Sequence, residues 1–420
     1  MFVRLLFFFS VYLLNVSVQA QGQPVVLLPA SGLVAKDLAI IVNRQDPLSV
    51  KIASYYQQKR KIPKENIITI SFQTGQSVMH PGEFAVLQKT VESKTPKHIQ
   101  AYLLTWADPY RVGCMSISSA FALGFDKQYC AEGCKLTAQS RYAGSTSLKP
   151  YDDLGIRPTM LLAATSFAQA KALIDRGIAA DGQAVLEDHE AFAYLVETSD
   201  KNRSVRKKVF PFVEALLAEQ ISINSIKTDA IKNKTQIMFY FTGKKFIDSI
   251  KSNQFLPGAM ADHLTSTGGK LTNSAQMSAL RWLEGGATGS YGTVVEPCNF
   301  LEKFPNPLVA MTHYLQGASL IEAYWKSVVM PGQGVFIGEP LAKPYAGYQL
   351  KAKEKGYELY SPVLTHGYYK ISTSSQEAGP FTLVTSGVEI TPYSKLITLP
   401  LPLAAFYKIE RLEGFTQSIF

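Results

Sequence analysis

The chain has 420 residues and a formal net charge of +9, from 42 Lys and Arg against 33 Asp and Glu. The basic residues are scattered, and no stretch alternates Lys or Arg with aromatic residues as a nucleic-acid groove would, so no nucleic-acid partner is expected. The largest basic cluster is typical of a solvated helix face, with weak attraction to an anionic envelope surface as the alternative. It consists of Arg203, Arg206, Lys207 and Lys208.

The first twenty residues have the pattern of a secretory signal peptide. Arg4 precedes the apolar run "LLFFFSVYLL", and "VQA" at 18–20 is a small-residue cleavage site. The apolar run is short for a membrane span, and an uncleaved anchor is the alternative. No later segment is long and apolar enough to cross a bilayer. We therefore expect a secreted or periplasmic protein that starts near Gln21.

The next elements in chain order predict a βαβ unit. The apolar run 38–42 is typical of a strand buried on both faces, and Pro47 after "NRQD" fits the first turn of a helix that ends near Lys61. "IPKENIITISF" returns as a second strand. A short crossover of this kind implies parallel strands and a right-handed connection.

The alternation of strand and helix continues to about residue 350. Strands are predicted in "AYLLTWADPYRV", "RPTMLLAAT", "AFAYLVETSD", "TQIMFYFTG", "GAMADHL", "TGSYGTVV" and "GQGVFIGEPL". Helices are predicted in "SFAQAKALIDRGIAA", capped by Ser166, at 206–219, in "SAQMSALRWLEGGA" and in "NPLVAMTHYLQGASLIEAYWKSV". The repeated alternation predicts an α/β domain over 21–350, with a mostly parallel sheet flanked by helices.

A loop-rich insertion, 113–153, contains three of the four cysteines. An even count in an exported chain suggests disulfides, and four cysteines allow three pairings. Cys130 and Cys134 are four residues apart, a spacing that a turn can close, which leaves Cys114 to pair with Cys298. No His pair accompanies the cysteines at ligand spacing, so a structural zinc site is not expected.

The pattern changes after about Lys351. Short, alternating, aromatic-rich segments separated by Gly and Pro follow, among them "YELYSPVLTHGYYKISTSS" and "GPFTLVT". They predict a small β-sandwich of immunoglobulin or fibronectin type over 351–420.

Candidate site residues follow the predicted strands. In a parallel sheet, sites gather at the carboxyl ends of strands, so the polar residues there are expected to share one edge. The binding candidates are Asp46, Asp200, Thr242, Thr265 and Glu339, and the catalytic candidates are Asp262, His263, Ser266 and Glu296.

The densest group of candidates lies in "ADHLTSTGGKL", at 261–271. Asp262, His263 and Ser266 suggest a catalytic triad, but a tight turn points such near neighbours apart. A broader site would join His263 or Ser266 to Glu296 or Asp200 from other strands. The alternative is a structural turn, in which Asp262 caps backbone amides and a hydroxyl begins the next helix.

Common cofactor and catalytic motifs are absent from the sequence. It has no G-x-S-x-G elbow, no Walker A loop and no H-E-x-x-H helix, and "GATGSYG" has the wrong spacing for a dinucleotide fingerprint. No cofactor and no metal site is identified, although carboxylates from separate strands could bind a metal without leaving a local motif.

Several segments together resemble a family of exported bacterial proteins that has no assigned activity. They are "NRQDPLSVKIASYYQQKRKIPKENII", "ADHLTSTGG", "GATGSYGTVVEPCNFLEKFPNP", "IEAYWKSV" and "FIGEPLAKP". The order of elements is also distantly similar to the gingipain-type cysteine peptidases of the caspase-like fold. That resemblance implies a caspase-like α/β core followed by an immunoglobulin-like domain.

The chain departs from the peptidase pattern where the chemistry would be. Thr242 stands where the peptidases have the histidine of a His-Gly strand end, no cysteine occurs at the nucleophile strand, and "IGEPL" replaces Gly-Asp-Pro. Thiolate attack needs a cysteine and a base. We therefore expect a peptidase-like protein, either a hydrolase of peptide or another envelope polymer that uses Asp262–Ser266, or a non-catalytic binding or accessory protein on a scaffold without the dyad.

Overall fold

The computed structural model describes residues 23–131, 133–186, 190–391 and 394–412. The predicted signal peptide, 1–20, lies outside the described residues. Within them, no helix combines the length and the hydrophobicity that crossing a membrane requires.

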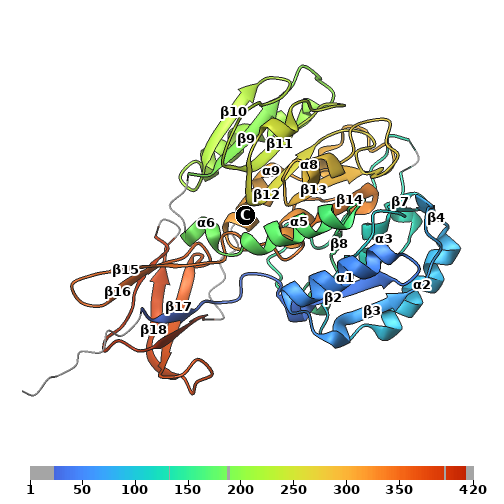
Figure 1. Cartoon of the computed structure of the whole chain (residues 1–420). Coiled ribbons are helices and arrows are strands. Elements are labelled where there is room, and N and C mark those ends of the chain that lie inside the picture. Colours follow the sequence, from blue (N-terminus) through green and yellow to red (C-terminus); the bar gives the residue numbers. More distant parts are fainter. Residues whose placement is uncertain (1–22, 132, 187–189, 392–393, 413–420) are drawn as a thin grey trace, which may run out of the picture.

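A large twisted sheet forms the centre of the molecule (Figure 1). Among the described residues it has ten strands, in the order β10-β9-β11-β12-β13-β14-β8-β5-β2-β3. Their bounds are β2 Leu38–Asn43, β3 Ile67–Ile70, β5 Ala101–Leu104, β8 Thr159–Leu161, β9 Phe192–Glu197, β10 Ser222–Lys227, β11 Ile237–Thr242, β12 Phe255–His263, β13 Gly289–Thr293 and β14 Gly334–Gly338. Every residue of β2, β5 and β11 is buried, as the continuous apolar runs predict.

The sheet consists of two parallel halves that run in opposite directions. β13 pairs antiparallel with β14, whereas β14 pairs parallel with β8. The strands β10, β9, β11, β12 and β13 therefore point one way, and β14, β8, β5, β2 and β3 point the other way. As a result, the carboxyl ends of the two halves lie at opposite edges of the sheet.

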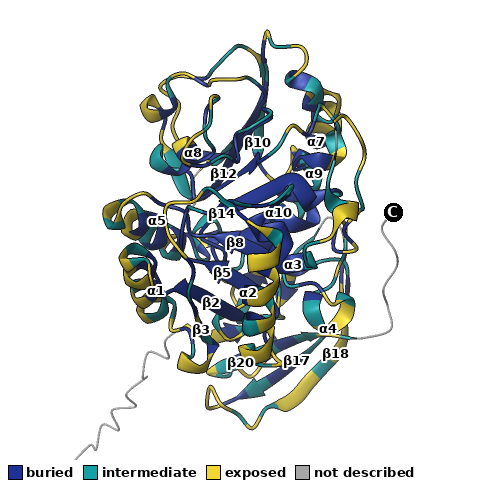
Figure 2. Ribbon diagram, turned by 90° about the vertical axis from the view of Figure 1, so that its right-hand side faces the viewer, coloured by how far each residue is buried: buried dark blue, intermediate teal, exposed yellow. Residues whose placement is uncertain are grey.

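Helices cover both faces of the sheet. Figure 2 shows α1 (Pro47–Arg60), α5 (Phe167–Ala179) and α8 (Leu280–Glu284) on one side of the strands, with a second layer of helices on the other. That second layer contains α3 Ile117–Leu123, α7 Phe210–Leu217, α9 Pro307–Leu315 and α10 Leu320–Lys326. The remaining helices are α2 Pro81–Lys94, α4 Pro150–Leu154 and α6 Gln183–Leu186. The expected α/β fold, a mostly parallel sheet flanked by helices, is confirmed.

The starts of the main helices follow local capping rules. Asp46 accepts a hydrogen bond from the Leu48 N–H at the start of α1, where Pro47 takes the first position. Ser166 caps α5 in the same way, through the Gln169 N–H. Short polar residues and prolines that follow strands therefore mark where these helices begin.

A small β-sandwich follows the α/β core. One sheet has the order β1-β20-β17-β18 and the other β15-β16-β19. Buried residues from both sheets, including Leu359, Ile371, Ile397 and Tyr407, form one core. The bounds are β1 Val25–Leu27, β15 Gln349–Ala352, β16 Tyr357–Tyr360, β17 Gly367–Ser374, β18 Thr382–Ile390, β19 Leu396–Thr398 and β20 Phe406–Arg411.

The first described strand, β1, belongs to this sandwich and not to the α/β core. Val25–Leu27 pairs in parallel with β20. The first described strand is thus paired with the last one, although almost the whole sequence separates them. The local pattern of 23–28 does not indicate this arrangement.

The insertion at 113–153 contains ordered structure, and its disulfides differ from the expected pairing. Two short strands, β6 (Arg111–Val112) and β7 (Met115–Ser116), pair with each other and, through β6, with β4 (Val78–Met79). Cys114 is bonded to Cys130, and Cys134 to Cys298, with Cα atoms 5.5 Å apart in both pairs. The pairing Cys130–Cys134 with Cys114–Cys298 is therefore wrong. The chain between Cys114 and Cys130 folds back through α3, which brings those two residues together although they are distant in sequence.

Candidate functional site

The candidate residues lie at two edges of the sheet, not at one. Asp46 and Glu339 follow β2 and β14, whereas Asp200, Thr242 and the 262–266 segment follow β9, β11 and β12. The two groups of strands run in opposite directions, so the expected convergence on a single edge is wrong. A sequence pattern cannot reveal this reversal, because the residues of a strand do not indicate in which direction it pairs with its neighbour.

Asp46 and Glu339 have structural partners at their edge. Asp46 caps α1. Glu339, completely buried, accepts hydrogen bonds from the Tyr56 hydroxyl at 2.5 Å and from Arg60 Nη2 at 2.6 Å. Arg60 also pairs with Asp181 and donates to the Gly177 carbonyl, so Arg60, held by Glu339, joins the end of α1 to the end of α5.

Asp262 forms a buried ion pair with Arg206. Asp262 Oδ1 lies 2.5 Å from Arg206 Nη1, and the two side chains are 1% and 2% exposed. Arg206 Nη2 also donates to the backbone oxygen of Thr242 at 2.5 Å. Arg206 therefore connects the carboxyl ends of β11 and β12 from the buried side of the sheet edge. The Asp262 carboxylate is shielded from solvent.

His263 is enclosed beside this pair. Its ring is 2% exposed, Nδ1 accepts a hydrogen bond from Trp282 Nε1 at 2.9 Å, and Nε2 lies 3.1 Å from the Met277 carbonyl. The contacts require a neutral ring with the proton on Nε2. Burial, followed by nearby Arg206 and Arg203, lowers the pKa of His263 to about 3. Neither nitrogen contacts Ser266 or a carboxylate.

The following "TSTGG" segment is a tightly packed turn. A Cβ on Gly269 would lie 2.5 Å from the backbone oxygen of Gly292, and a Cβ on Gly292 would lie 2.4 Å from Gly269 N. The Thr293 hydroxyl bonds to the carbonyls of Thr265 and Ser266 at 3.1 and 3.0 Å. The glycines in this motif allow the turn to lie against β13, which is a packing requirement.

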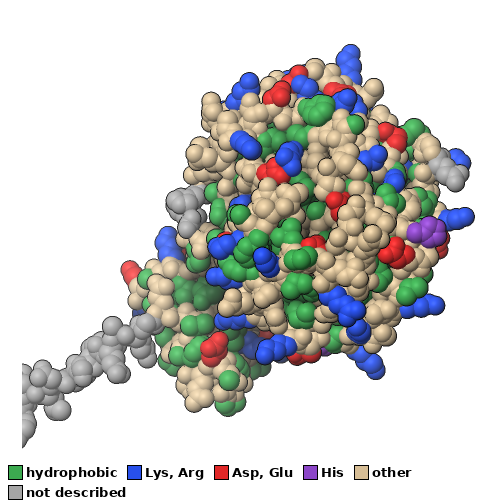
Figure 3. Space-filling view, turned by 45° about the vertical axis from the view of Figure 1, so that its right-hand side comes forward, with side chains coloured by type: hydrophobic (Ala, Val, Ile, Leu, Met, Phe, Trp, Pro, Cys, Tyr) green, Lys and Arg blue, Asp and Glu red, His purple; other side chains and the backbone are tan. Residues whose placement is uncertain are grey.

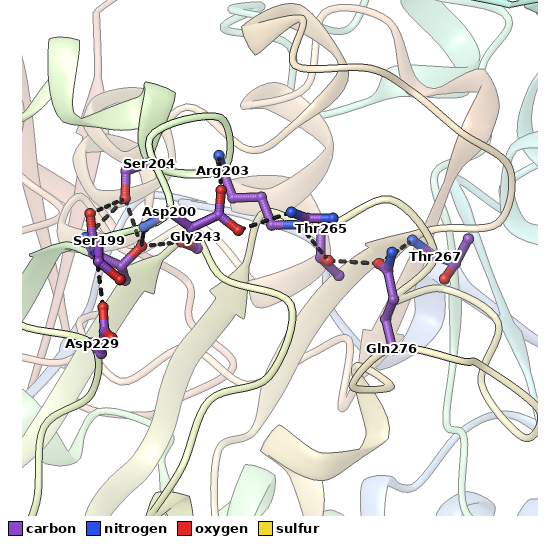
Figure 4. A network of polar contacts seen from close by, with 10 residues as sticks. Ser199, Asp200, Arg203, Ser204, Asp229, Gly243, Thr265, Thr267 and Gln276 are labelled. Atoms are coloured by element: carbon purple, nitrogen blue, oxygen red, sulfur yellow. Dashed lines mark hydrogen bonds and ion pairs between the residues drawn. The ribbon is translucent and has the colours of Figure 1, made fainter.

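A partly exposed polar network, centred on the buried Thr265 side chain, lies at the carboxyl ends of β9 and β12 (Figure 4). Asp200 pairs with Arg203 at 2.8 Å, with side chains 23% and 25% exposed. Arg203 Nε donates to the Thr265 hydroxyl at 3.1 Å, and that hydroxyl donates to Gln276 Oε1 at 2.6 Å. We call the four residues Asp200, Arg203, Thr265 and Gln276 the polar rim.

The remaining candidates make few contacts. Ser266 is half-buried, and only its backbone carbonyl takes part in a hydrogen bond with a side chain of the described residues, that of Thr293. The Thr242 hydroxyl is buried and likewise unpaired within the described chain. Glu296 is exposed and accepts a hydrogen bond from the Cys298 N–H at 2.8 Å. The described geometry thus brings Asp200 and Thr265 together but forms no chain of Ser, His and carboxylate.

Sequence reasoning did not select Arg203, Arg206 or Gln276 as site residues. The two arginines had the pattern of a solvated helix face, yet Arg206 is 2% exposed and its guanidinium lies under the sheet edge. Gln276 lies in a predicted helix, but the helix there begins only at Leu280. Nothing in the local pattern distinguishes these residues from ordinary surface positions.

The described residues contain no group of three or more His, Cys, Asp or Glu side chains that could hold a metal ion. On the face in Figure 3, Lys and Arg side chains are spread among acidic and neutral ones and form no continuous stripe.

Comparison with protein-family models and with curated protein sequences gave no match. Among solved structures, the chain is similar to the Arg-specific cysteine proteinase gingipain R, with 11% identity, a TM-score of 0.45, and coverage of 90% of this chain and 94% of that one. It is also similar to the complex of Porphyromonas gingivalis RgpB pro- and mature domains (11% identity, TM-score 0.46, 88% and 94% covered). A third similar structure, described as "Structure of Protease", shares 8% identity at a TM-score of 0.41, with 90% and 95% covered. At this level of similarity the site has to be interpreted from its own contacts.

Proposed function

We propose that the protein is a non-catalytic recognition protein that binds a peptide or another acceptor-rich cell-envelope polymer at the polar rim. The observation that carries the proposal is the enclosure of His263. A general base must reach the proton that it removes and must have a free lone pair. The ring of His263 has no free nitrogen, and its lowered pKa keeps it neutral above about pH 3.

The rim supplies the donors that such a ligand requires. Arg203 Nη2 and Gln276 Nε2 form no hydrogen bond with any described residue, although both side chains are fixed through Thr265. Two donors held through the same Thr265 hydroxyl suit carbonyl, carboxylate or hydroxyl oxygens. Because the side chains are already held by neighbours, little rotamer freedom is lost on binding.

The two disulfides support a site of action outside the reducing cytoplasm, where an envelope polymer would be encountered.

The test is binding and turnover measured on the same samples. The oxidised protein is incubated with a library of acetylated, amidated pentapeptides and with solubilised cell-wall fragments. Mass spectrometry then measures retention after size filtration and any shortening of the ligand. We expect retention without shortening. Arg203→Ala should weaken binding by about tenfold or more, since hydrogen bonds to a charged group contribute about 1.5–3 kcal/mol. Gln276→Ala should weaken it by about twofold to tenfold, since a hydrogen bond from a neutral amide contributes about 0.5–1.5 kcal/mol.

Lys207→Ala is the matched control. Lys207 is a nearby exposed cation that pairs with Glu197 and does not belong to the rim. Equal loss of binding in this variant would indicate a general charge effect and would contradict the rim. Shortened ligand that disappears in Ser266→Ala would show a hydrolase at 262–266 and would replace the proposal.

A further inference from the structure

A small cavity with a volume of about 200 Å³ lies between α5, the end of β8 and α8, and it shares no residue with the polar rim. Its apolar wall includes Ala172, Leu173 and Leu283. Its polar lining is provided by Gln169, Arg176 and Glu284. Gln169, Leu173 and Arg176 are four and three residues apart, so they share one face of α5.

Arg176 is a half-buried cation without an acidic partner among the described residues. It forms no ion pair with any described residue. Nη2 donates to the carbonyls of Leu283 and Ala287 at 3.2 and 2.7 Å, whereas Nε is buried and unpaired in the described structure. Nη1 has no hydrogen-bond partner among the described residues. Burial lowers the pKa of Arg176 to about 10, as expected where no carboxylate compensates the charge.

The other polar groups leave the site positively charged. Glu284 lies in the wall, but its Oε1 is 2.5 Å from Arg281 Nη2, so its charge is balanced. Gln169 Oε1 accepts hydrogen bonds from the N–H and the hydroxyl of Thr165. Gln169 Nε2 forms no hydrogen bond with any described residue. The cavity therefore presents two sets of donors, one of them charged, against aliphatic walls.

We propose that this cavity binds a carboxylate attached to a short aliphatic chain. The carboxylate would accept from Arg176 Nη1, because a half-buried cation without an ion-pair partner is stabilised when a counter-charge comes near. The aliphatic part would lie against Leu173 and Leu283. A volume of about 200 Å³ limits the bound group to a few carbon atoms.

The same chemistry has two sources, a free short-chain acid and an acidic side chain of a peptide. Butyrate is the probe for the first source, and the blocked tripeptide Ac-Ala-Glu-Ala-NH2 is the probe for the second. Binding of butyrate alone assigns the site to a free acid. Binding of both assigns it to a carboxylate side chain as well, and either result supports the cavity.

The experiment is ligand-observed NMR on the oxidised full chain at constant ionic strength. Butyrate should show saturable binding, whereas butylammonium and n-butanol, which match its length, should show none. Arg176→Gln should weaken butyrate binding by about tenfold to a hundredfold, and Arg176→Lys, which keeps the charge, by less.

Two further variants keep the proposal falsifiable if Arg176→Gln does not fold. Ala172 lines the cavity from an exposed helix position, so Ala172→Leu fills the space without removing Arg176, and it should abolish binding. Arg141→Gln is the control, because Arg141 is exposed and donates to the Leu154 carbonyl away from the cavity. Undiminished butyrate binding in Ala172→Leu, or no carboxylate binding by the wild-type protein, would overturn the proposal. The rim variants Arg203→Ala and Gln276→Ala should leave butyrate binding unchanged, which separates this site from the proposed function.

Discussion

Arg206 and Asp262 form an ion pair at 2.5 Å beneath the sheet edge, with only 2% and 1% of their side chains exposed. Two charges at this depth are held by each other and by the carbonyl of Thr242. Asp262 Oδ2 and Arg206 Nε have no further partner among the described residues. The pair therefore joins η4 (Ser204–Lys208) to β12 and has no freedom to act on a ligand.

Asp262→Asn should destabilise the fold by about 3–5 kcal/mol, because it leaves the Arg206 charge buried without compensation. Urea denaturation monitored by tryptophan fluorescence measures this. Asp200→Asn is the matched control, since Asp200 pairs with a partly exposed arginine, and that change should cost less than about 1 kcal/mol. Equal costs for the two variants would contradict the structural role of the buried pair.

His263→Ala should cost about 1–3 kcal/mol of stability, because Trp282 Nε1 and the Met277 carbonyl lose their buried partner. The same denaturation experiment applies. His366→Ala should stay within about 0.5 kcal/mol of wild type, because His366 is less buried and its side chain forms no hydrogen bond with the described residues. An unchanged melting curve for His263→Ala, accompanied by lost ligand binding, would make His263 a site residue after all.

The burial of the His263 ring should also make the free energy of unfolding depend on pH. The folded pKa of His263 is about 3, below the ordinary value near ~6.5 for an unfolded chain. Between these values the unfolded state binds a proton that the folded state does not, so His263 favours unfolding increasingly as pH falls from about 6.5 toward 3.

The measurement is the free energy of unfolding at several pH values for the wild type and His263→Gln. The difference between the two curves isolates this residue from His313, whose pKa burial also lowers, to about 4. The wild-type curve should fall more steeply with decreasing pH, by up to about 1.4 kcal/mol per pH unit. Parallel curves would mean that the ring takes up its proton equally in the folded and unfolded states, and so is not shielded by burial.

The two disulfides should contribute unequally to stability. The Cys134–Cys298 bond closes a separation of 164 residues and the Cys114–Cys130 bond one of 16. In the chain-entropy description the longer closure stabilises by roughly 5 kcal/mol and the shorter by roughly 3. Thermal unfolding of the two double Cys→Ala variants should therefore show the larger loss for Cys134 and Cys298. Peptide mapping of unreduced protein checks the pairing itself, and recovery of a Cys130–Cys134 peptide would reverse the assignment.

Local signals in the sequence predicted much of the α/β core. The continuous apolar run at β2, the cap and proline that begin α1, and the Ser166 cap of α5 each depend on neighbouring residues alone. Strand β10 and helix α2 were not predicted: β10 lies at the sheet edge and is only partly buried, so it lacks the apolar run that marks the central strands. Local patterning identifies an element well when burial is complete and poorly when it is partial.

The central strands and the helix caps can be read from the sequence, because they depend on backbone preference and on burial patterns among neighbouring residues. The antiparallel pairing of β14 with β13, the bond between Cys130 and Cys114, and the pairing of β1 with the distant sandwich depend on tertiary packing. Tertiary packing also determines the role of "ADHLTS", because Asp262 contacts Arg206 and His263 contacts Trp282, and both partners come from other parts of the chain. Whether a polar side chain is a ligand-binding group or a buried structural one depends on long-range neighbours, and these are set by packing and not by adjacency in sequence.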